Sequence, residues 1–533
     1  MASDRMSKRI PVIDLFAGPG GLGEGFASLR LTKRRLPCFT IALSVEKEEC
    51  AHRTLELRTL FRHLQGSTAS EEYYRYVRGE ITRDELFNAC PDEAETARAQ
   101  AWHAELGGAE TPAAEVDKRI EAALEGKRWW VLVGGPPCQA YSIIGRSRMS
   151  KVRKKTPQKY DDDPRHLLYR EYLRILAEHA PPVFVMENVP GLLSSRLKGA
   201  SIFHRMIRDL QNPKKAVREA AENAYSGARH RYSIHSLVSN EATGSLSPEL
   251  KPRDFVIRSE EYGIPQTRHR VILLGVRKDI EQTPRALKKH PRVMSVWDAI
   301  SDTPRIRSVL SREKDSLDTW RESLQSVTRA DWLDDPAVSG KVKGRIVSAL
   351  SDIGAGLTKG GNFVPLDGRD GDAGKTRCDR RLKGYCNHSA RRHMRTDLVR
   401  YLFAACFAEV EGRTPKLADY PEALLPLHAS VPDALSGGYF NDRFRVQVKN
   451  EPSTTVVSHI SKDGHYYIHP DPTQCRSLTV REAARLQTFP DNYFFEGPRT
   501  AQYRQVGNAV PPLLAKQIAR IVYDLLKDTG GIN

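Results

Sequence analysis

Residues 11–29 read PVIDLFAGPGGLGEGFASL, and this stretch decides the fold class of the chain. The apolar residues 11–16 are typical of a short strand, residues 17–21 predict a glycine turn, and residues 22–29 predict the start of a helix. Glycines in such a turn permit positive φ angles and let a ligand approach the backbone. A purely structural turn explains them equally well, because their spacing is not the dinucleotide pattern G-x-G-x-x-G.

Further apolar runs continue this strand-and-helix pattern at residues 39–45, 129–133, 182–186 and 271–276. Short apolar strands that alternate with helical segments predict an α/β fold, with a parallel sheet covered on both faces. Ligands bind at the carboxyl ends of the strands in such sheets. Glu46, residues 134–138 and Glu187 follow three of these runs directly, so we expect them to surround a site.

The composition favours a basic, globular protein that binds a polyanion. The chain has 533 residues and a formal net charge of +17, which favours nucleic acid over a membrane surface as the partner. A generally basic protein without such a partner is the alternative. The sequence lacks an apolar run of roughly 18 residues, and its N-terminus lacks a signal-peptide apolar region, so we predict a cytoplasmic protein.

The eight cysteines are scattered along the chain, which predicts reduced thiols and not a disulfide framework. Cys378, Cys386, His388 and His393 suggest a zinc site. Their spacing, C-x7-C-x-H-x4-H, does not match the common zinc patterns, in which paired cysteines lie about two to four residues apart. We therefore expect no metal.

Two segments interrupt the α/β pattern. In residues 51–127, Leu, Phe and Tyr recur three and four positions apart among many charges, which predicts a helical insertion between two strands. Residues from about 300 to 470 form an irregular stretch with a glycine-rich segment and a basic run. We therefore predict a catalytic domain at 1–300, a smaller irregular domain at 301–475 and a return to the catalytic domain at 476–533.

Three groups of residues carry the chemistry. Cys138 follows two prolines of fixed φ at a strand end, where a thiol can act as a nucleophile; an inert buried cysteine is the alternative. Glu187 could hydrogen-bond a heterocycle and hold a proton, or cap a turn. Arg268 and Arg270 share one face where the chain enters a strand, and could grip a carbonyl or anionic oxygen or lie on a solvated edge.

Taken together, these motifs resemble those of the bacterial-type DNA (cytosine-5-)-methyltransferase family. Six blocks occur in the family's order, and these are DLFAGPGG, GGPPCQAYS, ENVPGL, QTRHR, RSLTVREAARLQTFPD and QVGNAVPPLLA. They span residues 11–520, with large inserts and a weaker seventh block at 163–176. The resemblance implies a Rossmann-like S-adenosylmethionine-dependent methyltransferase sheet, mostly parallel with helices on both faces, and a smaller target-recognition domain.

The resemblance also implies a role for individual residues. Those that would bind S-adenosyl-L-methionine are Phe16, Gly18, Gly20, Gly21, Glu46, Pro136, Leu168 and Asn508. The Cys138 thiolate would attack carbon 6 of cytosine, which makes carbon 5 able to accept a methyl group. Glu187 would hydrogen-bond N3 and the 4-amino group, and Arg270 would hold the 2-oxo group with support from Arg268.

The implied substrate is duplex DNA with the target cytosine flipped out of the stack, because a stacked base cannot reach such a pocket. Residues 146–159 carry seven Lys or Arg and no acid, and residues 375–395 carry eight Lys or Arg and one Asp. Both runs suit phosphate contacts. The predicted DNA contacts are Gln139, Ser142, Arg146, Arg148, Lys151, Arg153, Lys154, Lys155, Arg391 and Arg392.

The sequence departs from the family pattern in three places. Lys47 follows Glu46 where an aromatic that stacks on adenine is common. The block that usually brings an Asp to the adenine amino group is not recognisable. The 51–127 insertion that occupies its place is unusually long, and either caps the fold or contacts DNA or a partner protein.

Other functions remain open on the sequence. A tRNA cytosine-C5 methyltransferase on the same scaffold is one alternative, and a catalytically silent DNA-binding regulator is another. As a biological role, a restriction–modification or other phage-defence system competes with an orphan regulatory methyltransferase. We expect a monomer unless defence-system proteins associate with it.

Overall fold

The structure is a computed structural model that describes most of the chain: residues 9–31, 36–136, 165–197, 200–221, 230–239, 251–354, 356–366, 379–428, 431–436 and 441–530. The predicted nucleophile Cys138 lies outside the described residues. So do Cys378 and the predicted DNA contacts Gln139, Ser142, Arg146, Arg148, Lys151, Arg153, Lys154 and Lys155.

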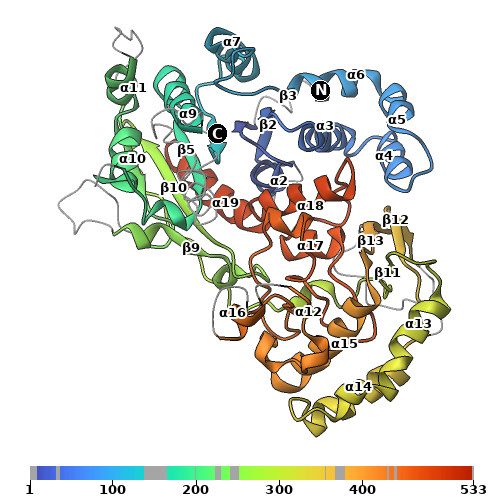
Figure 1. The fold of residues 1–533 in the computed structure, drawn as a ribbon. Helices are drawn as coiled ribbons and strands as arrows, with labels where there is room; N and C mark the ends of the chain where they lie inside the picture. Colours follow the sequence, from blue (N-terminus) through green and yellow to red (C-terminus); the bar gives the residue numbers. More distant parts are fainter. Residues whose placement is uncertain are drawn as a thin grey trace.

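An eight-stranded sheet forms the centre of the molecule, in the order β3-β2-β1-β4-β5-β10-β8, with β9 also paired to β10 (Figure 1). Its strands are β1 (Ile10–Leu15), β2 (Phe39–Glu46), β3 (Ala101–His103), β4 (Val131–Gly134), β5 (Val183–Asn188), β8 (Tyr232–His235), β9 (Val256–Arg258) and β10 (His269–Arg277). The run from β3 to β5 is parallel, whereas β10 is antiparallel to β5. The predicted α/β fold with a mostly parallel sheet is therefore confirmed.

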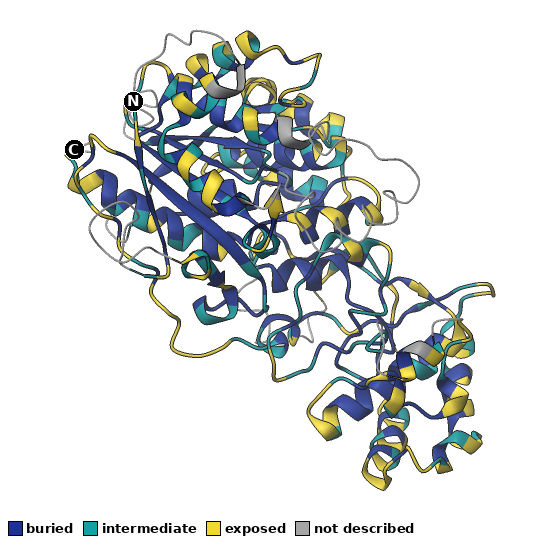
Figure 2. Cartoon of the chain, turned by 60° about the vertical axis from the view of Figure 1, so that its left-hand side comes forward, coloured by how far each residue is buried: buried dark blue, intermediate teal, exposed yellow. Residues whose placement is uncertain are grey.

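Helices cover both faces of the sheet. On one face, α2 (Gly21–Ala27) and α19 (Pro512–Asp528) pack together over β1 and β2. On the other face lie α7 (Ala113–Leu124), α9 (Arg165–His179) and α10 (Ile202–Gln211). Every residue of β1 and β4 is buried, because each strand contributes side chains to both cores (Figure 2). This explains why these strands are mostly apolar, with Asp14 as a buried polar residue in β1.

The 51–127 segment contains the predicted helices, which are most of α3 (Glu49–Leu64) and then α4 (Ser70–Val77), α5 (Arg83–Ala89), α6 (Pro91–Gln100) and α7. It also contributes β3, which pairs in parallel with β2 through Ser44 and Ala101. The sequence analysis missed this strand because three residues are too few to show a period-2 pattern. The segment therefore extends the sheet as well as carrying helices.

The 301–475 region has a hydrophobic core of its own. Its helices α13 (Leu317–Gln325), α14 (Gly340–Ser351) and α15 (Arg395–Glu411) pack around Trp320, Ile346 and Leu402, which are fully buried. Two small sheets, β12 (Gly360–Pro365) with β13 (Gly384–Ser389) and β11 (Val309–Leu310) with β14 (Arg392–His393), lie beside these helices (Figure 1). A short helix, α16 (Val431–Leu435), follows. The exact boundaries of this domain remain a prediction.

The chain then returns to the sheet. Helix α17 (Val480–Leu486) and helix α18 (Arg499–Asn508) share a core with α12 (Val296–Ile300), and α19 closes the fold against α2. In the described part of the chain, no helix combines the length and the apolar character that a membrane span requires.

Candidate active site

A cavity of about 450 Å³ opens at the carboxyl ends of β1, β2, β4 and β5. Its walls come from the β1–α2 turn, the end of β2, the segment after β3, the first residues after β4, and the end of β5. Residues of β10, the loop at 457–458 and the end of α18 complete it. This is the edge of the sheet at which the sequence predicts a site.

The turn after β1 presents its backbone to this cavity. Phe16 and Gly18 both have positive φ angles, 55° and 59°, and both line the cavity. A Cβ on Gly18 would meet no atom within 4 Å, so the space beside it is open. A side chain would be strained at this φ and would fill part of that space. A ligand can therefore approach the turn closely at Gly18.

Gly20 and Gly21 have a different role from Gly18, since they do not line the cavity. A Cβ on Gly20 would lie 2.7 Å from Cδ2 of Leu55, and one on Gly21 would lie 2.2 Å from the carbonyl oxygen of Val510. These glycines allow α3 and the chain after α18 to approach the turn. They therefore contribute to the cavity by allowing its walls to pack closely, and not by lining it.

Glu46 closes the turn from the neighbouring strand. Its Oε2 accepts a hydrogen bond from the amide of Gly18 at 2.8 Å, and its Oε1 accepts one from the amide of Glu48 at 2.8 Å. Burial raises the pKa of Glu46 above its ordinary value. Each carboxylate oxygen can accept more than one hydrogen bond, so Glu46 retains acceptor capacity for hydroxyl groups of a ligand.

Three more of the predicted cofactor residues line the same cavity, although they come from distant parts of the chain. Pro136 follows β4, Leu168 lies on α9, and Asn508 ends α18. The structure thus brings Phe16, Gly18, Glu46, Pro136, Leu168 and Asn508 around one space.

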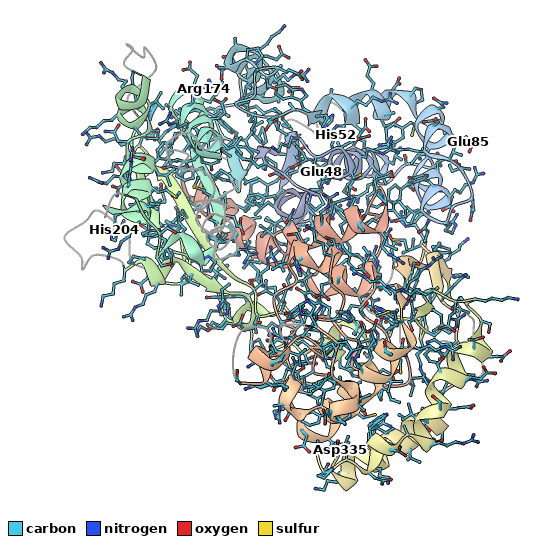
Figure 3. The ribbon with its side chains drawn as sticks, in the orientation of Figure 1. Glu48, His52, Glu85, Arg174, His204 and Asp335 are labelled. Atoms are coloured by element: carbon cyan, nitrogen blue, oxygen red, sulfur yellow. The ribbon has the colours of Figure 1, made fainter. Side chains whose placement is uncertain are left out.

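The sequence analysis did not identify one wall of the cavity. Ala104, Glu105 and Leu106 follow β3 and line the cavity, and Glu105 Oε1 lies 2.8 Å from Lys47 Nζ. Helix α3 supports this wall, because His52 Nε2 bonds the carbonyl oxygen of Ala101 at 2.9 Å. Figure 3 labels His52 on this helix and Glu48 directly before its first residue. Lys47 and Glu105 therefore form an ion pair in the same cavity wall as Glu46.

Glu187 and Arg270 meet at the far side of the cavity, because their strands are neighbours. In the antiparallel β5–β10 ladder Glu187 pairs with Ile272, and Arg270 lies two positions from Ile272 on the same face of the sheet. Arg270 Nε lies 2.8 Å from Glu187 Oε1, and Arg270 Nη1 donates to the carbonyl oxygen of His269 at 2.7 Å. Burial lowers the pKa of Arg270, although Glu187 opposes this effect. A carboxylate and a guanidinium thus face one cavity together.

Arg268 is fully buried and holds the backbone of two loops. Its Nη1 donates to the carbonyl oxygen of Val456 at 2.7 Å, and both Nη1 and Nη2 donate to that of Gly507 at 3.2 Å. These contacts fix the 457–458 loop and the end of α18, which both line the cavity. The loop approaches α18 so closely that a Cβ on Gly507 would lie 2.4 Å from the amide nitrogen of Ser458. In the sequence, the signal for this contact is Gly507 in the segment QVGNAV, because a residue with a side chain would not fit there.

The chain leaving β4 runs against Glu187. A Cβ on Gly135 would lie 2.9 Å from Glu187 Oε2, so only a glycine fits here without displacing the carboxylate. Gly135 and Pro136 both line the cavity. Gly135, which precedes Cys138 by three residues in the sequence, therefore lies beside Glu187.

The two predicted DNA contacts of the 301–475 region differ in their surroundings. Arg391 is buried, with its Cζ 3.9 Å from the ring centroid of Tyr503 and a hydrogen bond from its Nη2 to the carbonyl oxygen of Ile460. Arg392 is exposed on β14. The guanidinium of Arg391 is thus used inside the protein, whereas that of Arg392 is available to a partner.

The described members of the cysteine–histidine set each have protein partners. Arg481 Nη2 donates to Cys386 Sγ at 2.8 Å. His388 Nδ1 lies 3.0 Å from Thr479 Oγ1, and His393 Nε2 lies 3.2 Å from Ser477 Oγ. Among the described residues, no three His, Cys, Asp or Glu side chains are grouped as metal ligands.

Comparisons with known proteins agree with this geometry. A family model for C-5 cytosine-specific DNA methylase matches residues 91–236 and 254–523. Type II methyltransferase M.Bpa9945I of Bacillus paralicheniformis is 33% identical, over 97% of this chain and 99% of that protein. Type II methyltransferase M.AgeI of Thalassovita gelatinovora is 26% identical, over 96% and 98%. DNA (cytosine-5-)-methyltransferase M.ApeKI of Aeropyrum pernix is 25% identical, over 78% and 85%.

Proposed function

The chain belongs to the C-5 cytosine-specific DNA methylase family, and from this premise we propose that it methylates carbon 5 of a flipped-out cytosine in a specific sequence of duplex DNA. S-adenosyl-L-methionine would be the methyl donor. The observation that carries the proposal is the shared cavity, because Glu46 and the glycine turn face the same space as Glu187 and Arg270.

The residues present fit S-adenosyl-L-methionine. Glu46 keeps acceptor capacity that suits ribose hydroxyls, and the open space at Gly18 lets the ligand lie against the backbone of the turn. Leu168 and Pro136 offer apolar contacts, and Lys47 and Glu105 offer a donor and an acceptor at the rim. When bound, this cofactor supplies an electrophilic methyl group.

Glu187 and Arg270 would hold the cytosine ring. Glu187 would hydrogen-bond N3 and the 4-amino group and favour protonation at N3, and Arg270 would donate to the 2-oxo group. Their present ion pair keeps both groups oriented before the base arrives. Arg268 would position them through the loops that it holds.

Cys138 would act as the nucleophile. In our proposal its thiolate forms a bond to carbon 6, which makes carbon 5 electron-rich enough to take the methyl group. A base then removes the proton from carbon 5, the bond between sulfur and carbon 6 breaks, and the 5,6 double bond returns. The position of Gly135 and Pro136, which precede Cys138 in the sequence and line the cavity with Glu187, supports this arrangement.

The DNA would lie across the carboxyl edge of the sheet. We propose that the basic run at 146–159 contacts phosphates next to the flipped base, and that the 301–475 region recognises the target sequence, with Arg392 exposed for contact. Two of the relatives above are named type II methyltransferases. These names favour a role in restriction–modification or another phage-defence system. We also propose that the chain acts in the cytoplasm, as a monomer unless defence-system proteins associate with it.

Bisulfite sequencing of DNA from a host that expresses the protein tests this function. We expect methylated cytosines at one recurring sequence with the wild type, and none with Cys138→Ala, a variant that should still bind DNA and S-adenosyl-L-methionine. Methylation of tRNA without methylation of DNA would contradict the proposal. So would turnover by Cys138→Ala.

A further inference from the structure

We propose that helix α4 fixes the orientation of the 301–475 region over the active-site cavity, so that Tyr74 and Arg78 are positioning residues for the choice of the DNA target. This inference rests on the proposed role of the 301–475 region in recognition. It assigns a function to the long insertion, which neither caps an isolated surface nor extends away from the molecule.

The insertion shares a hydrophobic core with the 301–475 region. Side chains of α3, α4, α5 and α6 form one buried cluster with Leu382 and Cys386, which are both fully buried. Phe363 of β12 packs against the same cluster. Figure 1 shows α4 and α5 on the side of the molecule where β12 and β13 lie. The two segments are therefore joined by a continuous apolar contact.

Polar contacts add direction to this apolar one. The hydroxyl of Tyr74 donates a hydrogen bond to Oδ2 of Asp379, and Arg78 Nη1 donates to the carbonyl oxygen of Arg381 at 3.1 Å. The guanidinium of Arg381 lies over the ring of Tyr74, with its Cζ 4.8 Å from the centroid. Hydrogen bonds constrain orientation in a way that apolar packing does not.

The same helix is anchored to the segment that returns to the catalytic domain. The hydroxyl of Tyr73 donates to the carbonyl oxygen of Asn492 at 2.6 Å, and that of Tyr76 donates to Oε1 of Glu496 at 2.7 Å. Asn492 Nδ2 in turn donates to Asp379 Oδ2 at 2.8 Å. Helix α4 thus lies between the two parts of the chain and contacts both.

The contact falls at a place where orientation matters for recognition. Asp379 and Arg381 belong to the basic run at 375–395, for which the sequence predicts phosphate contacts. Specificity depends on presenting side chains to base edges in a fixed register, and phosphate contacts set that register. A small rotation of the segment around Asp379 and Arg381, which does not line the cavity, would therefore weaken discrimination between sites before it affected the chemistry at the cavity.

Two variants of the full-length protein separate this role from general stability. Tyr74→Phe removes the hydroxyl that donates to Asp379 of the 301–475 region and that accepts from Asn492 Nδ2 at 3.4 Å. Tyr76→Phe is the matched control, because it removes a hydroxyl from the same helix that bonds Glu496 instead. The measurements are the Michaelis constant for DNA, the saturated turnover rate, and the ratio of methylation at the target to methylation at sites with one mismatch.

With Tyr74→Phe we expect a higher Michaelis constant for DNA and a loss of about tenfold in the target-to-mismatch ratio, the size that a charge-assisted hydrogen bond can account for. The saturated turnover rate and the Michaelis constant for S-adenosyl-L-methionine should stay at the wild-type level. With Tyr76→Phe the ratio should remain that of the wild type. Equal ratios for the two variants would overturn the inference.

Two further outcomes complete the test. Asp379→Asn keeps an oxygen that can accept from Tyr74, so it should retain more of the ratio than Tyr74→Phe; a greater loss would count against the proposed bond. If Tyr74→Phe is too unstable to assay, Arg78→Gln takes its place with the same expectation. Failure of the wild type to methylate cytosine at a fixed site would refute the proposed function, whereas equal ratios refute only the role of α4.

Discussion

At the scale of single residues, burial changes the proton affinity of one carboxyl group in the central sheet, that of Asp14. Asp14 lies in β1 and is fully buried. Burial raises its pKa to about 7, although the charge of Arg62 and the amide of Gly23 act in the opposite direction. The folded protein therefore holds a proton on Asp14 at pH values at which an unfolded chain has lost it.

The first prediction concerns this proton. An aspartate in an unfolded chain has a pKa of about 3.9, so between roughly pH 4 and pH 7 the folded state binds more protons and stability falls as the pH rises. Asp14→Asn cannot lose a proton, so its melting temperature should fall less than that of the wild type between pH 5 and pH 8. Thermal denaturation at the two pH values checks this. If the melting temperatures of the wild type and of Asp14→Asn fell by the same amount between pH 5 and pH 8, Asp14 would not contribute to the pH dependence of stability.

Residue identity explains which parts of the site the sequence could predict. Glu46 and Glu187 follow apolar runs directly, so their place at one edge of the sheet follows from the parallel topology. Glu105 and Ser458 could not be found in this way. Glu105 follows a strand of only three residues, which is too short for a recognisable pattern. Ser458 lines the cavity because its backbone packs against Gly507, which comes from a distant part of the sequence.

At the scale of elements, a buried ion pair joins α2 to α3 behind the glycine turn. Glu24 of α2 accepts from Arg58 Nε at 3.0 Å and from Arg62 Nη2 at 3.0 Å, and both arginines lie on α3. Burial alone would raise the pKa of Glu24, but Arg58 and Arg62 lower it to about 2. The turn that lines the cavity is thus held from behind by charges.

The second prediction follows from this pair. Glu24→Ala leaves Arg58 buried without its carboxylate, which should lower the free energy of unfolding by about 3–5 kcal/mol at neutral pH. Because the folded pKa lies below the unfolded value, the wild type should lose this stability as the pH falls from roughly 4.5 towards 2. Urea denaturation of both proteins at pH 7 and pH 3 measures the effect. If the difference in free energy of unfolding between the wild type and Glu24→Ala were as large at pH 3 as at pH 7, the ion pair of Glu24 would not be its source.

The elements also show where sequence patterns stop being informative. All five strands that the apolar runs predict are present, because strands buried on both faces consist mainly of apolar residues. The antiparallel direction of β10 could not be predicted, since it depends on which neighbour the strand pairs with and not on its composition. The contact between Tyr74 of α4 and Asp379 likewise joins segments about 300 residues apart.

At the scale of the whole molecule, the charge of +17 and the placement of the basic runs argue for a long contact with the DNA backbone. The described part of the chain places the cavity in the sheet domain and a second core in the 301–475 region. In the proposed function both parts contact the same DNA duplex.

The third prediction is a strong dependence of DNA binding on salt. With roughly four phosphate contacts, the dissociation constant should rise by about a hundredfold between 50 and 200 mM salt, because counterions are released from the DNA on binding. Fluorescence anisotropy with a labelled duplex that contains the target measures this. A dissociation constant that is insensitive to salt would contradict a backbone contact of this size.

The most direct test of the central claim uses duplex DNA in which 5-fluorocytosine replaces the target cytosine. Fluorine at carbon 5 cannot leave as a proton does, so the bond between the protein and the base should persist after methyl transfer. With S-adenosyl-L-methionine present, we predict a denaturation-resistant adduct whose cross-linked peptide contains Cys138, and no adduct with Cys138→Ala. Methylation of ordinary DNA by the wild type without any adduct, or an adduct at a different residue, would contradict the account.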